Sequence, residues 1–252
     1  MTTNSTTNAG AWIRGRRPLP SRGFTLVELM VALSIGLLVT IGILTLLGAM
    51  RRTSTTQTGL STLQENERIA MSLITDMVQT AGYYPNPVTN SPTTLFTAVS
   101  PYAAGQFISG LDATSDTLYV RYATNGTDYV IDCMGNTYSA GAQFTLASTL
   151  SVVNGYLQCT LNNGTTATTV QLVSGISSMQ IWYGVQSKPG STNNSVDAYV
   201  TAANVTDWTK VLTVKVTLNF VNPLAGQPGQ PTLSTIGFTR VITLMNKTGV
   251  NS

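Results

Sequence analysis

Hydrophobic and polar residues fall into successive patterns along the chain. Residues 1–23 are polar and contain four arginines, whereas the 22 residues from Leu29 to Met50 carry no charge. At 1.5 Å per residue, a helix of that length spans about 33 Å, which matches the hydrocarbon core of a bilayer. Arginines before an apolar span keep that end of a chain in the cytoplasm. The pattern predicts a cytoplasmic leader and then a membrane-spanning helix; a secretory signal peptide is the alternative, but its apolar region would be shorter.

From Thr53 the helical pattern continues but becomes amphipathic. Apolar residues recur every three or four positions, which places them on one stripe of a helix. The stripe is Leu60, Leu63, Ala70, Ile74 and Met77, and the polar positions include Glu65, Glu67, Arg68, Asp76 and Gln79. Gly82 is suited to end the helix, and Pro85 and Pro87 forbid its continuation. We expect one helix over about 25–80 whose second half packs on a sheet; a free coiled coil would need a longer stripe.

The rest of the chain has the alternation typical of half-buried strands. Residues 83–116 come first and are rich in Pro, Thr and Ser, which predicts a long connection with little regular structure. The predicted strands are Thr117–Ala123, Tyr129–Cys133, Gln143–Ala147, Tyr156–Leu161, Thr168–Val173, Met179–Val185, Val211–Phe220 and Thr235–Leu244. Asn125-Gly126 and Asn163-Gly164 are typical of hairpin turns. The fold class expected is α+β, with a long N-terminal helix packed on an antiparallel β-sheet domain.

These patterns divide the chain into four parts. We expect a removable leader over 1–23, a transmembrane segment over 24–50, an amphipathic continuation of the helix over 51–82, and a β-rich globular domain over 83–252. Only 9% of the residues are charged, whereas about a quarter is usual in soluble proteins. Because Thr, Ser, Asn and Gly supply the polar surface instead, the last part resembles an exported or surface-displayed domain.

The net charge of +3 is misleading as evidence for a nucleic-acid partner. Four of the thirteen basic residues precede Phe24, so removal of the leader leaves nine basic and ten acidic side chains. A DNA-uptake receptor would need an exposed basic stripe, but the remaining cations are dispersed. They include Arg121, Lys188, Lys210, Lys215, Arg240 and Lys247. We therefore expect no nucleic acid as a partner.

The usual parts of an active site are missing from the sequence. There is no histidine, which removes Ser-His-Asp and Cys-His catalysis and His-ligated zinc. The acidic residues Asp112, Asp116, Asp128 and Asp132 do not follow the spacing of an EF-hand loop, so turn and strand-edge roles are favoured over calcium. Trp182, Tyr183 and Trp208 are interpreted as core aromatics rather than a binding surface. We expect no catalysis, no metal and no cofactor.

Cys133 and Cys159 are the only two cysteines of the chain. An even number of cysteines in an exported chain predicts a disulfide, and two buried free thiols are the alternative. Closing a loop of about 26 residues would stabilise the fold by roughly 3–4 kcal/mol on the chain-entropy model. Because both cysteines lie in or beside strand-like runs, we expect the bond to join two neighbouring strands.

One carboxylate, that of Glu28, lies at the start of the apolar span. A charge inside such a span is costly, by at least ~2.5 kcal/mol when it lies near the helix centre. The surrounding string Arg22-Gly23-Phe24-Thr25-Leu26-Val27-Glu28-Leu29 resembles the cleavage and methylation site of type IV pilins and pseudopilins. The resemblance implies that prepilin peptidase cuts between Gly23 and Phe24, and that the new amine of Phe24 is methylated. It also implies that Glu28 recruits and registers the subunit in a filament. Simple snorkelling of Glu28 to the interface is the alternative.

More of the chain is similar to one subgroup, the PilW-type minor pilins. The segments that carry this similarity are Gln64–Ala70, Gly82–Tyr84, Ser115–Tyr122, Asp132-Cys133, Val173–Ile176, Tyr183-Gly184, Trp208 and Val211–Leu218. The resemblance implies a minor subunit that primes assembly of a type IV pilus and sits in or near its tip. Its implied partners are the inner membrane, prepilin peptidase, other minor and major pilins and a tip adhesin.

Two other functions share these features. A minor pseudopilin of a type II secretion system has the same leader, helix and glutamate, and a DNA-uptake or adhesive pilin would use the same anchor. In each case the resemblance implies a single-pass inner-membrane protein with a cytoplasmic N-terminus. A pilin then moves to the surface pilus on assembly.

Overall fold

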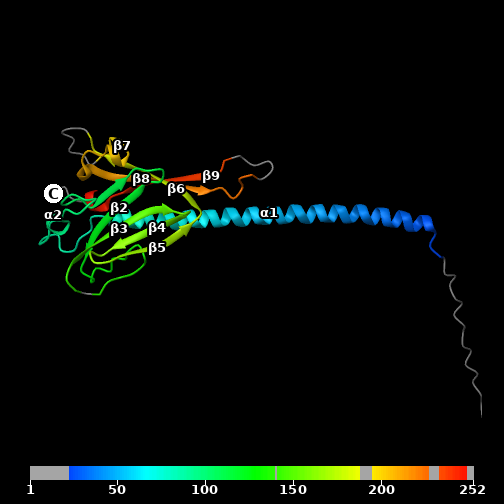
Figure 1. Ribbon diagram of the computed structural model, residues 1–252, viewed down its shortest axis with the longest axis horizontal. Coiled ribbons are helices and arrows are strands. Elements are labelled where there is room, and N and C mark those ends of the chain that lie inside the picture. Colours follow the sequence, from blue (N-terminus) through cyan, green and yellow to red (C-terminus); the bar gives the residue numbers. More distant parts are fainter. Residues whose placement is uncertain (1–22, 140, 188–194, 227–232, 249–252) are drawn as a thin grey trace, which may run out of the picture. The chain divides into compact units, whose positions relative to one another are not determined.

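The computed structural model describes residues 23–139, 141–187, 195–226 and 233–248 (Figure 1). The predicted leader, apart from Gly23, therefore lies outside the described residues. The chain forms two compact units, Met1–Thr53 and Ser54–Ser252. Helix α1 (Leu26–Thr80) contributes residues to both units and confirms the long helix predicted from the sequence.

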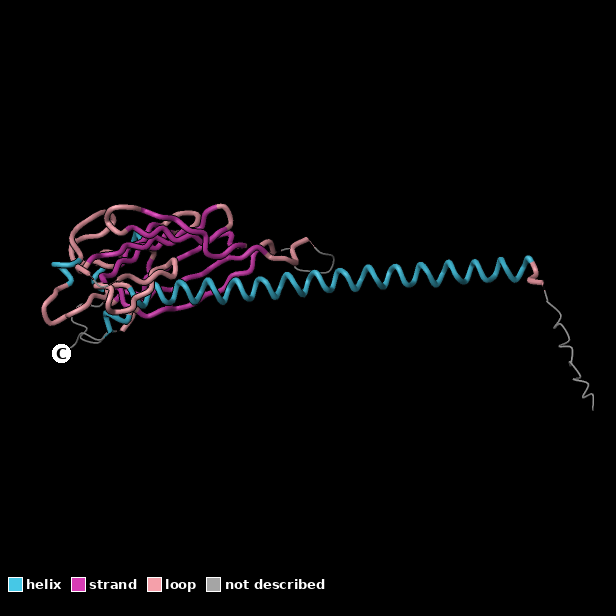
Figure 2. Tube along the Cα trace, turned by 90° about the horizontal axis from the view of Figure 1, so that it is seen from below, coloured by secondary structure: helices cyan, strands magenta, loops and turns pink. Residues whose placement is uncertain are grey.

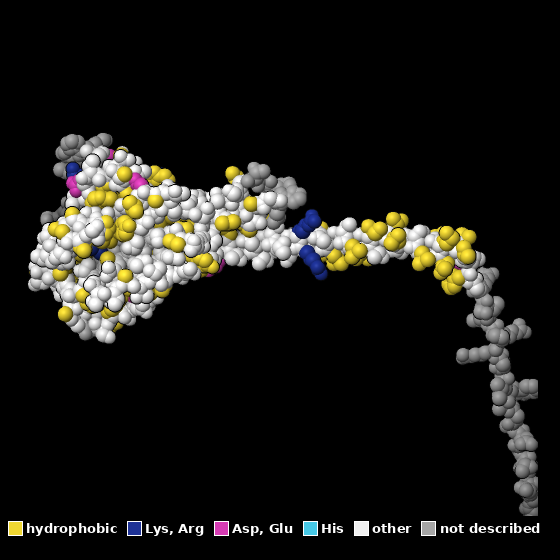
Figure 3. Space-filling model, viewed as in Figure 1, with side chains coloured by type: hydrophobic (Ala, Val, Ile, Leu, Met, Phe, Trp, Pro, Cys, Tyr) yellow, Lys and Arg dark blue, Asp and Glu magenta, His cyan; other side chains and the backbone are white. Residues whose placement is uncertain are grey.

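In the first unit, α1 carries no charged residue between Leu29 and Met50. Its large hydrophobic side chains are all exposed, and Figure 3 shows hydrophobic side chains distributed along this part of the helix. The hydroxyls of Ser34, Thr40 and Thr45 donate to backbone carbonyls three or four residues earlier, which satisfies polar groups without water. By length and composition this helix could cross a membrane.

In the second unit, one face of α1 is buried in the protein. Leu63, Ala70, Ile74 and Met77 of the predicted stripe are all buried, together with Met71 and Val78. Strands run beside this part of the helix (Figure 2), and its buried residues join a single hydrophobic core with residues of both sheets. This packing confirms the expected fold class and leaves the coiled-coil alternative without support.

Gly82, which was predicted to end α1, has a backbone conformation that only glycine adopts easily. Gly82 has a φ of +77°, a left-handed conformation that ends helices and costs other residues energy. Its amide donates to the carbonyl of Arg121 at 2.9 Å. A side chain would also collide with the ring of Phe107, because an added Cβ would lie 2.7 Å from it. The chain therefore leaves the helix directly against β2.

The strands form two antiparallel sheets in the described part of the chain (Figure 1). The five-stranded sheet has the order β1-β2-β3-β4-β5, and the four-stranded sheet has the order β7-β6-β8-β9. The strands are β1 (Ile108–Leu111), β2 (Thr117–Thr124), β3 (Phe144–Val153), β4 (Tyr156–Asn162), β5 (Ala167–Ser174), β6 (Ile176–Val185), β7 (Ala198–Val200), β8 (Val211–Val221) and β9 (Thr235–Thr243). Short helices are α2 (Pro92–Leu95), η1 (Ala202–Asn204), η2 (Trp208–Lys210) and α3 (Met245–Thr248).

One predicted strand and one predicted hairpin are wrong. Tyr129–Cys133 belongs to the loop over residues 125–143, which connects β2 to its antiparallel partner β3. Asn125-Gly126 therefore makes a turn within this loop, whereas Asn163-Gly164 does connect the paired strands β4 and β5. The short strands β1 and β7 were not predicted. A tight turn at Asn154-Gly155, where both φ angles are positive, joins β3 to β4 in the manner of a type I′ hairpin.

Arg121 on β2 is the largest fully buried side chain and not one of the dispersed surface cations. Its guanidinium donates to the carbonyls of four residues in the connection before β1, which are Phe96, Thr97, Ala103 and Gln106. It also lies against the ring of Tyr102, 4.5 Å from the ring centroid. The carbonyls of Phe96 and Ala103 also accept from the backbone amides of Gly105 and Gln106. Among the described residues, the carbonyls of Thr97 and Gln106 therefore depend on the guanidinium for a donor.

We predict that Arg121→Leu lowers the free energy of unfolding by about 3 kcal/mol or more. The substitution leaves the carbonyls of Thr97 and Gln106 without a donor, and each unsatisfied group costs about 1–3 kcal/mol. Urea unfolding followed by tryptophan fluorescence measures the change. Arg240→Leu is the matched control: Arg240 is exposed on β9, so its loss should cost less than about 1 kcal/mol. Equal effects of the two substitutions would contradict the anchoring role.

Candidate functional site

The first candidate site is the start of α1. Gly23 and Phe24 are exposed and precede the helix, which begins at Leu26. The hydroxyl of Thr25 accepts a hydrogen bond from the backbone amide of Glu28 at 3.2 Å. This contact is one half of a capping box, the Thr-x-x-Glu signature that satisfies free amides at a helix start. Sequence analysis missed it, although the four residues spell the motif.

Glu28 lies in the first turn of the helix and has an exposed side chain. A carboxylate there interacts favourably with the helix dipole, typically by 0.3–1 kcal/mol. Within the described residues, no ion-pair partner of Glu28 is present. The carboxylate can therefore pair with a cation that lies outside the described part of the chain. Its contribution to the stability of the helix itself is small.

The four aspartates considered for calcium each bind the protein itself. Asp112 accepts from two amides of η1, and Asp116 accepts from the amides of Ala113 and Ile181. Asp128 accepts from the hydroxyl of Thr124. No group of three metal-binding side chains occurs among the described residues. These contacts agree with the structural roles expected from the sequence.

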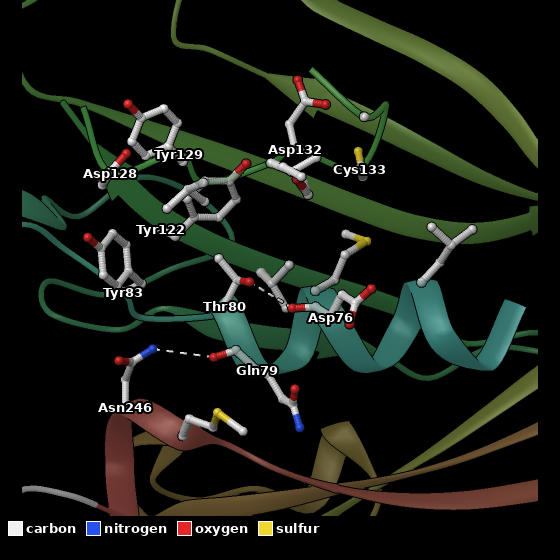
Figure 4. Close-up of a pocket in the computed structure, with 18 residues that line it drawn as sticks. Asp76, Gln79, Thr80, Tyr83, Tyr122, Asp128, Tyr129, Asp132, Cys133 and Asn246 are labelled. Atoms are coloured by element: carbon white, nitrogen blue, oxygen red, sulfur yellow. Dashed lines mark hydrogen bonds between the residues drawn. The ribbon is translucent and has the colours of Figure 1, made fainter. Parts of the chain in front are cut away.

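Cys133 and Cys159 form a disulfide with their Cα atoms 6.3 Å apart. The bond was predicted, but it does not join two strands: Cys133 lies in the loop over residues 125–143, and Cys159 lies in β4. The neighbouring carboxylate of Asp132 accepts from the hydroxyl of Tyr138 at 2.7 Å and from two loop amides. Figure 4 shows Asp132 and Cys133 together on this loop. A covalent bond and a buried acid thus hold a segment that has no strand partner.

Of the aromatic residues singled out in the sequence, Trp182 and Tyr183 are neighbours on β6, and Trp208 lies in η2. Tyr183 is buried and packs edge-on against Trp208, with ring centroids 4.8 Å apart. Trp182 points the other way and has the ammonium of Lys215 4.7 Å from its ring centroid. The same ammonium lies 5.1 Å from the ring of Tyr199. The core interpretation therefore holds for Tyr183, whereas Trp182 contributes to a partly exposed cation–π cluster.

Comparison with known families identifies two matching segments. The model described as Type IV Pilus-assembly protein W matches residues 137–231, and the model of the prokaryotic N-terminal methylation motif matches residues 20–49. The two matches confirm the predicted resemblance to type IV pilin-like proteins and to PilW. No curated protein sequence matches this chain.

Two solved structures are similar to this chain at low identity. One is a type IV-like pilin from Thermus thermophilus, with 12% identity, a TM-score of 0.41 and coverage of 73% of this chain and 96% of that chain. The other is from a complex of two type 2 secretion pseudopilins of Vibrio vulnificus, with 10% identity, a TM-score of 0.35 and coverage of 75% and 98%. At this similarity they add nothing to the fold described above.

We predict that reducing the disulfide lowers the free energy of unfolding by roughly 3–4 kcal/mol, because the closed loop restricts the unfolded chain. Urea unfolding with and without reductant measures the difference. Hydrogen exchange should increase first in residues 125–139, since the loop has no strand partner to hold its amides. Cys133→Ser with Cys159→Ser should reproduce the reduced protein. Unchanged stability would contradict the role given to the bond.

Acid should destabilise the same loop. Burial alone would raise the pKa of Asp132, but hydrogen bonds from Tyr138, Asn136 and Met134 outweigh it and hold the pKa below its ordinary value. The stabilisation is therefore complete above the unfolded-state pKa of about 3.9 and is lost as the pH falls through the folded-state pKa. Urea unfolding between about pH 3 and 6 should show this loss, with a smaller slope in Asp132→Asn. Identical slopes would contradict it.

Proposed function

We propose that this chain is a minor pilin of a type IV pilus, which primes filament assembly and sits in or near the tip. The observation that carries the proposal is the occurrence of two family signatures on one chain. The methylation motif covers residues 20–49 and the PilW model covers residues 137–231. A continuous helix leads from the first segment into the domain that contains the second.

The helix start suits processing by prepilin peptidase. Gly23 has no side chain, and no atom of the described residues lies within 4 Å of the place where a Cβ would be. A peptidase can therefore approach the backbone between Gly23 and Phe24 closely. Cleavage would create an amine at Phe24, which is then methylated. Phe24 and Glu28 are four residues apart, a spacing that places two groups on one helix face.

In this proposal Glu28 sets the register between neighbouring subunits. Apolar helices slide along one another at little cost in lipid, because every stagger buries the same kind of surface. A carboxylate in a medium of low dielectric constant is costly alone and is stabilised by a cation at short distance. The amine of a neighbouring Phe24 is such a cation, so only one stagger pairs both charges. The hydroxyls of Ser34, Thr40 and Thr45 donate to carbonyls of their own helix. These three hydroxyls therefore do not compete with the charge pair for hydrogen bonds between subunits.

A minor pseudopilin of a type II secretion system would use the same leader and the same glutamate. The family that matches residues 137–231 is that of a type IV pilus-assembly protein, which favours the pilus. Deletion of the chain's gene separates the two: loss of surface pili supports the proposal, whereas loss of protein secretion with normal pili supports the pseudopilin.

We predict that the mature protein begins at N-methylated Phe24. Intact mass and N-terminal sequencing of the membrane-extracted protein measure this directly. The mass should also be lower by two hydrogens than that of the reduced chain, because Cys133 and Cys159 are bonded. A chain that keeps residues 1–23 in cells with active prepilin peptidase would overturn the processing step and the assembly argument with it.

We also predict that Glu28→Ala leaves cleavage largely intact but weakens incorporation into filaments about tenfold or more, which corresponds to at least ~1.4 kcal/mol. The fraction of the chain recovered in sheared pili measures incorporation. Thr25→Ala is the matched control, because it removes the cap on the Glu28 amide but keeps the carboxylate. If Thr25→Ala weakens incorporation as much as Glu28→Ala, helix capping rather than charge pairing explains the effect.

A further inference from the structure

The second unit contains a pocket that the proposed function does not use. It has a volume of about 630 Å³. Its walls come from four separate segments: the last turns of α1, strands β2 and β3, the loop anchored by the disulfide, and Met245 with Asn246 at the C-terminal end of the described chain. Figure 4 shows Asp76 and Thr80 on the helix side, Asp128 and Asp132 on the loop side, and Tyr83 and Tyr122 between them.

The lining combines apolar surface with negative charge. Buried apolar residues include Met77 and Val120, whereas Asp76, Asp128 and Asp132 are acidic. No lysine or arginine occurs among the described residues that line the pocket. A ligand that fits needs a hydrocarbon part for the apolar surface and a positive charge for the carboxylates.

The three carboxylates play different parts. Asp132 is occupied by the loop, and Asp128 accepts from the hydroxyl of Thr124 at 2.6 Å. The side chain of Asp76 is exposed and makes no hydrogen bond among the described residues. Asp76 is therefore the carboxylate that can contact a ligand directly, while the other two contribute their negative charge.

Two hydroxyls in the pocket wall add an independent sign of a ligand. Tyr122 and Ser148 line the pocket and are 3% and 1% exposed. Their hydroxyl oxygens are buried and have no hydrogen-bond partner in the described part of the chain. Buried hydroxyls without partners are rare and costly. Burial and the nearby Asp132 raise the pKa of Tyr122, so its hydroxyl stays neutral and its oxygen is free to accept from a cationic donor.

The edge of the pocket points to a protein as the source of the ligand. Tyr129 and Ile131 line it and are 83% and 60% exposed, which is high for large hydrophobic side chains. Tyr129 also has a φ of +55°, a conformation that costs a non-glycine residue energy and occurs mostly where function requires it. Exposed apolar groups beside a pocket mark a surface that a partner covers.

We propose that this pocket binds the side chain of a lysine or arginine presented by a partner protein. The alkyl stem lies against Met77 and the neighbouring apolar wall, and the charged head pairs with Asp76 within the negative field of the loop. A metal ion is a poorer fit, because the described residues hold no set of three ligands.

Methyl NMR of the full chain in lipid nanodiscs tests the proposal. Met77 and Met245 line the pocket, whereas Met50 lies in the first unit and Met179 is buried in β6. With ¹³C-methyl-methionine labelling, n-butylguanidinium should shift the signals of Met77 and Met245 with a dissociation constant on the order of 1 mM. Met179 should not move, and Met50 reports any partition into lipid. Equal shifts with n-butanol, or no shift of the pocket methyls, would overturn the proposal.

A capped residue identifies the source of the cation. N-acetyl-arginine amide carries the same side chain on a peptide backbone, as a partner protein would. It should bind within about threefold of n-butylguanidinium, since threefold is less than ~1 kcal/mol. If the free alkyl cation binds and the capped arginine does not, the pocket serves a free amine and the protein partner is wrong.

Three substitutions test the residues. Asp76→Asn should weaken binding of n-butylguanidinium roughly fivefold or more, because it removes the direct charge at short range. Glu67→Gln is the matched control on the same helix, outside the pocket lining, and should leave binding unchanged. Tyr122→Phe should weaken binding without lowering stability, since the hydroxyl has no hydrogen-bond partner among the described residues. If Glu67→Gln acts as strongly as Asp76→Asn, overall charge explains the binding and the site is wrong.

This inference does not depend on the proposed function. The measurements use purified protein and small molecules, and every lining residue lies within the second unit. Failure of N-terminal processing would leave them interpretable, and failure of binding would leave the role of Phe24 and Glu28 unaffected.

Discussion

The burial of one stripe of α1 against two sheets is the interaction on which the rest of the domain depends. Residues from Leu63 to Val78 supply the helical side of a core that also takes side chains from both sheets. Each Å² of apolar surface that this stripe buries contributes roughly 25 cal/mol to the stability of the domain. Between Leu29 and Met50 the same helix carries no charge, and its large hydrophobic side chains are exposed. The sequence of one helix thus changes from an uncharged apolar segment that could cross a membrane to an amphipathic segment that packs on the sheets.

Because α1 and the sheets supply the regular hydrogen bonds, the long connections need other means of support. The segment before β1 depends on the buried guanidinium of Arg121. The loop between β2 and β3 depends on the disulfide of Cys133 and on the carboxylate of Asp132. In each case a side chain replaces the backbone pairing that a strand would have supplied. Irregular segments held in this way have a fixed structure, so the loop between β2 and β3 can line the pocket as well as join two strands.

Elements governed by local rules were predictable from the sequence, and those governed by distant partners were not. The helix and its stop at Gly82 follow from periodicity and from a left-handed terminal residue. Tyr129–Cys133 has the apolar content of a strand, but Asp132 bonds to its own loop and the segment finds no neighbour to pair with. The motif around Glu28 is contiguous and could be recognised directly. The pocket could not, because its walls lie far apart in the chain and its charges become a group only after folding.

The inward hydrogen bonds of Ser34, Thr40 and Thr45 have a consequence for the geometry of assembly. With these hydroxyls turned onto their own backbone, the span from Leu29 to Met50 offers a neighbouring helix almost nothing but hydrocarbon. Such a surface offers the same kind of contact at every rotation of the helix about its axis. Along this span, no directional contact favours one face of the helix over another as the face that meets a neighbour. The azimuth of the helix must then be set elsewhere, by its charged start or by the domain that follows it.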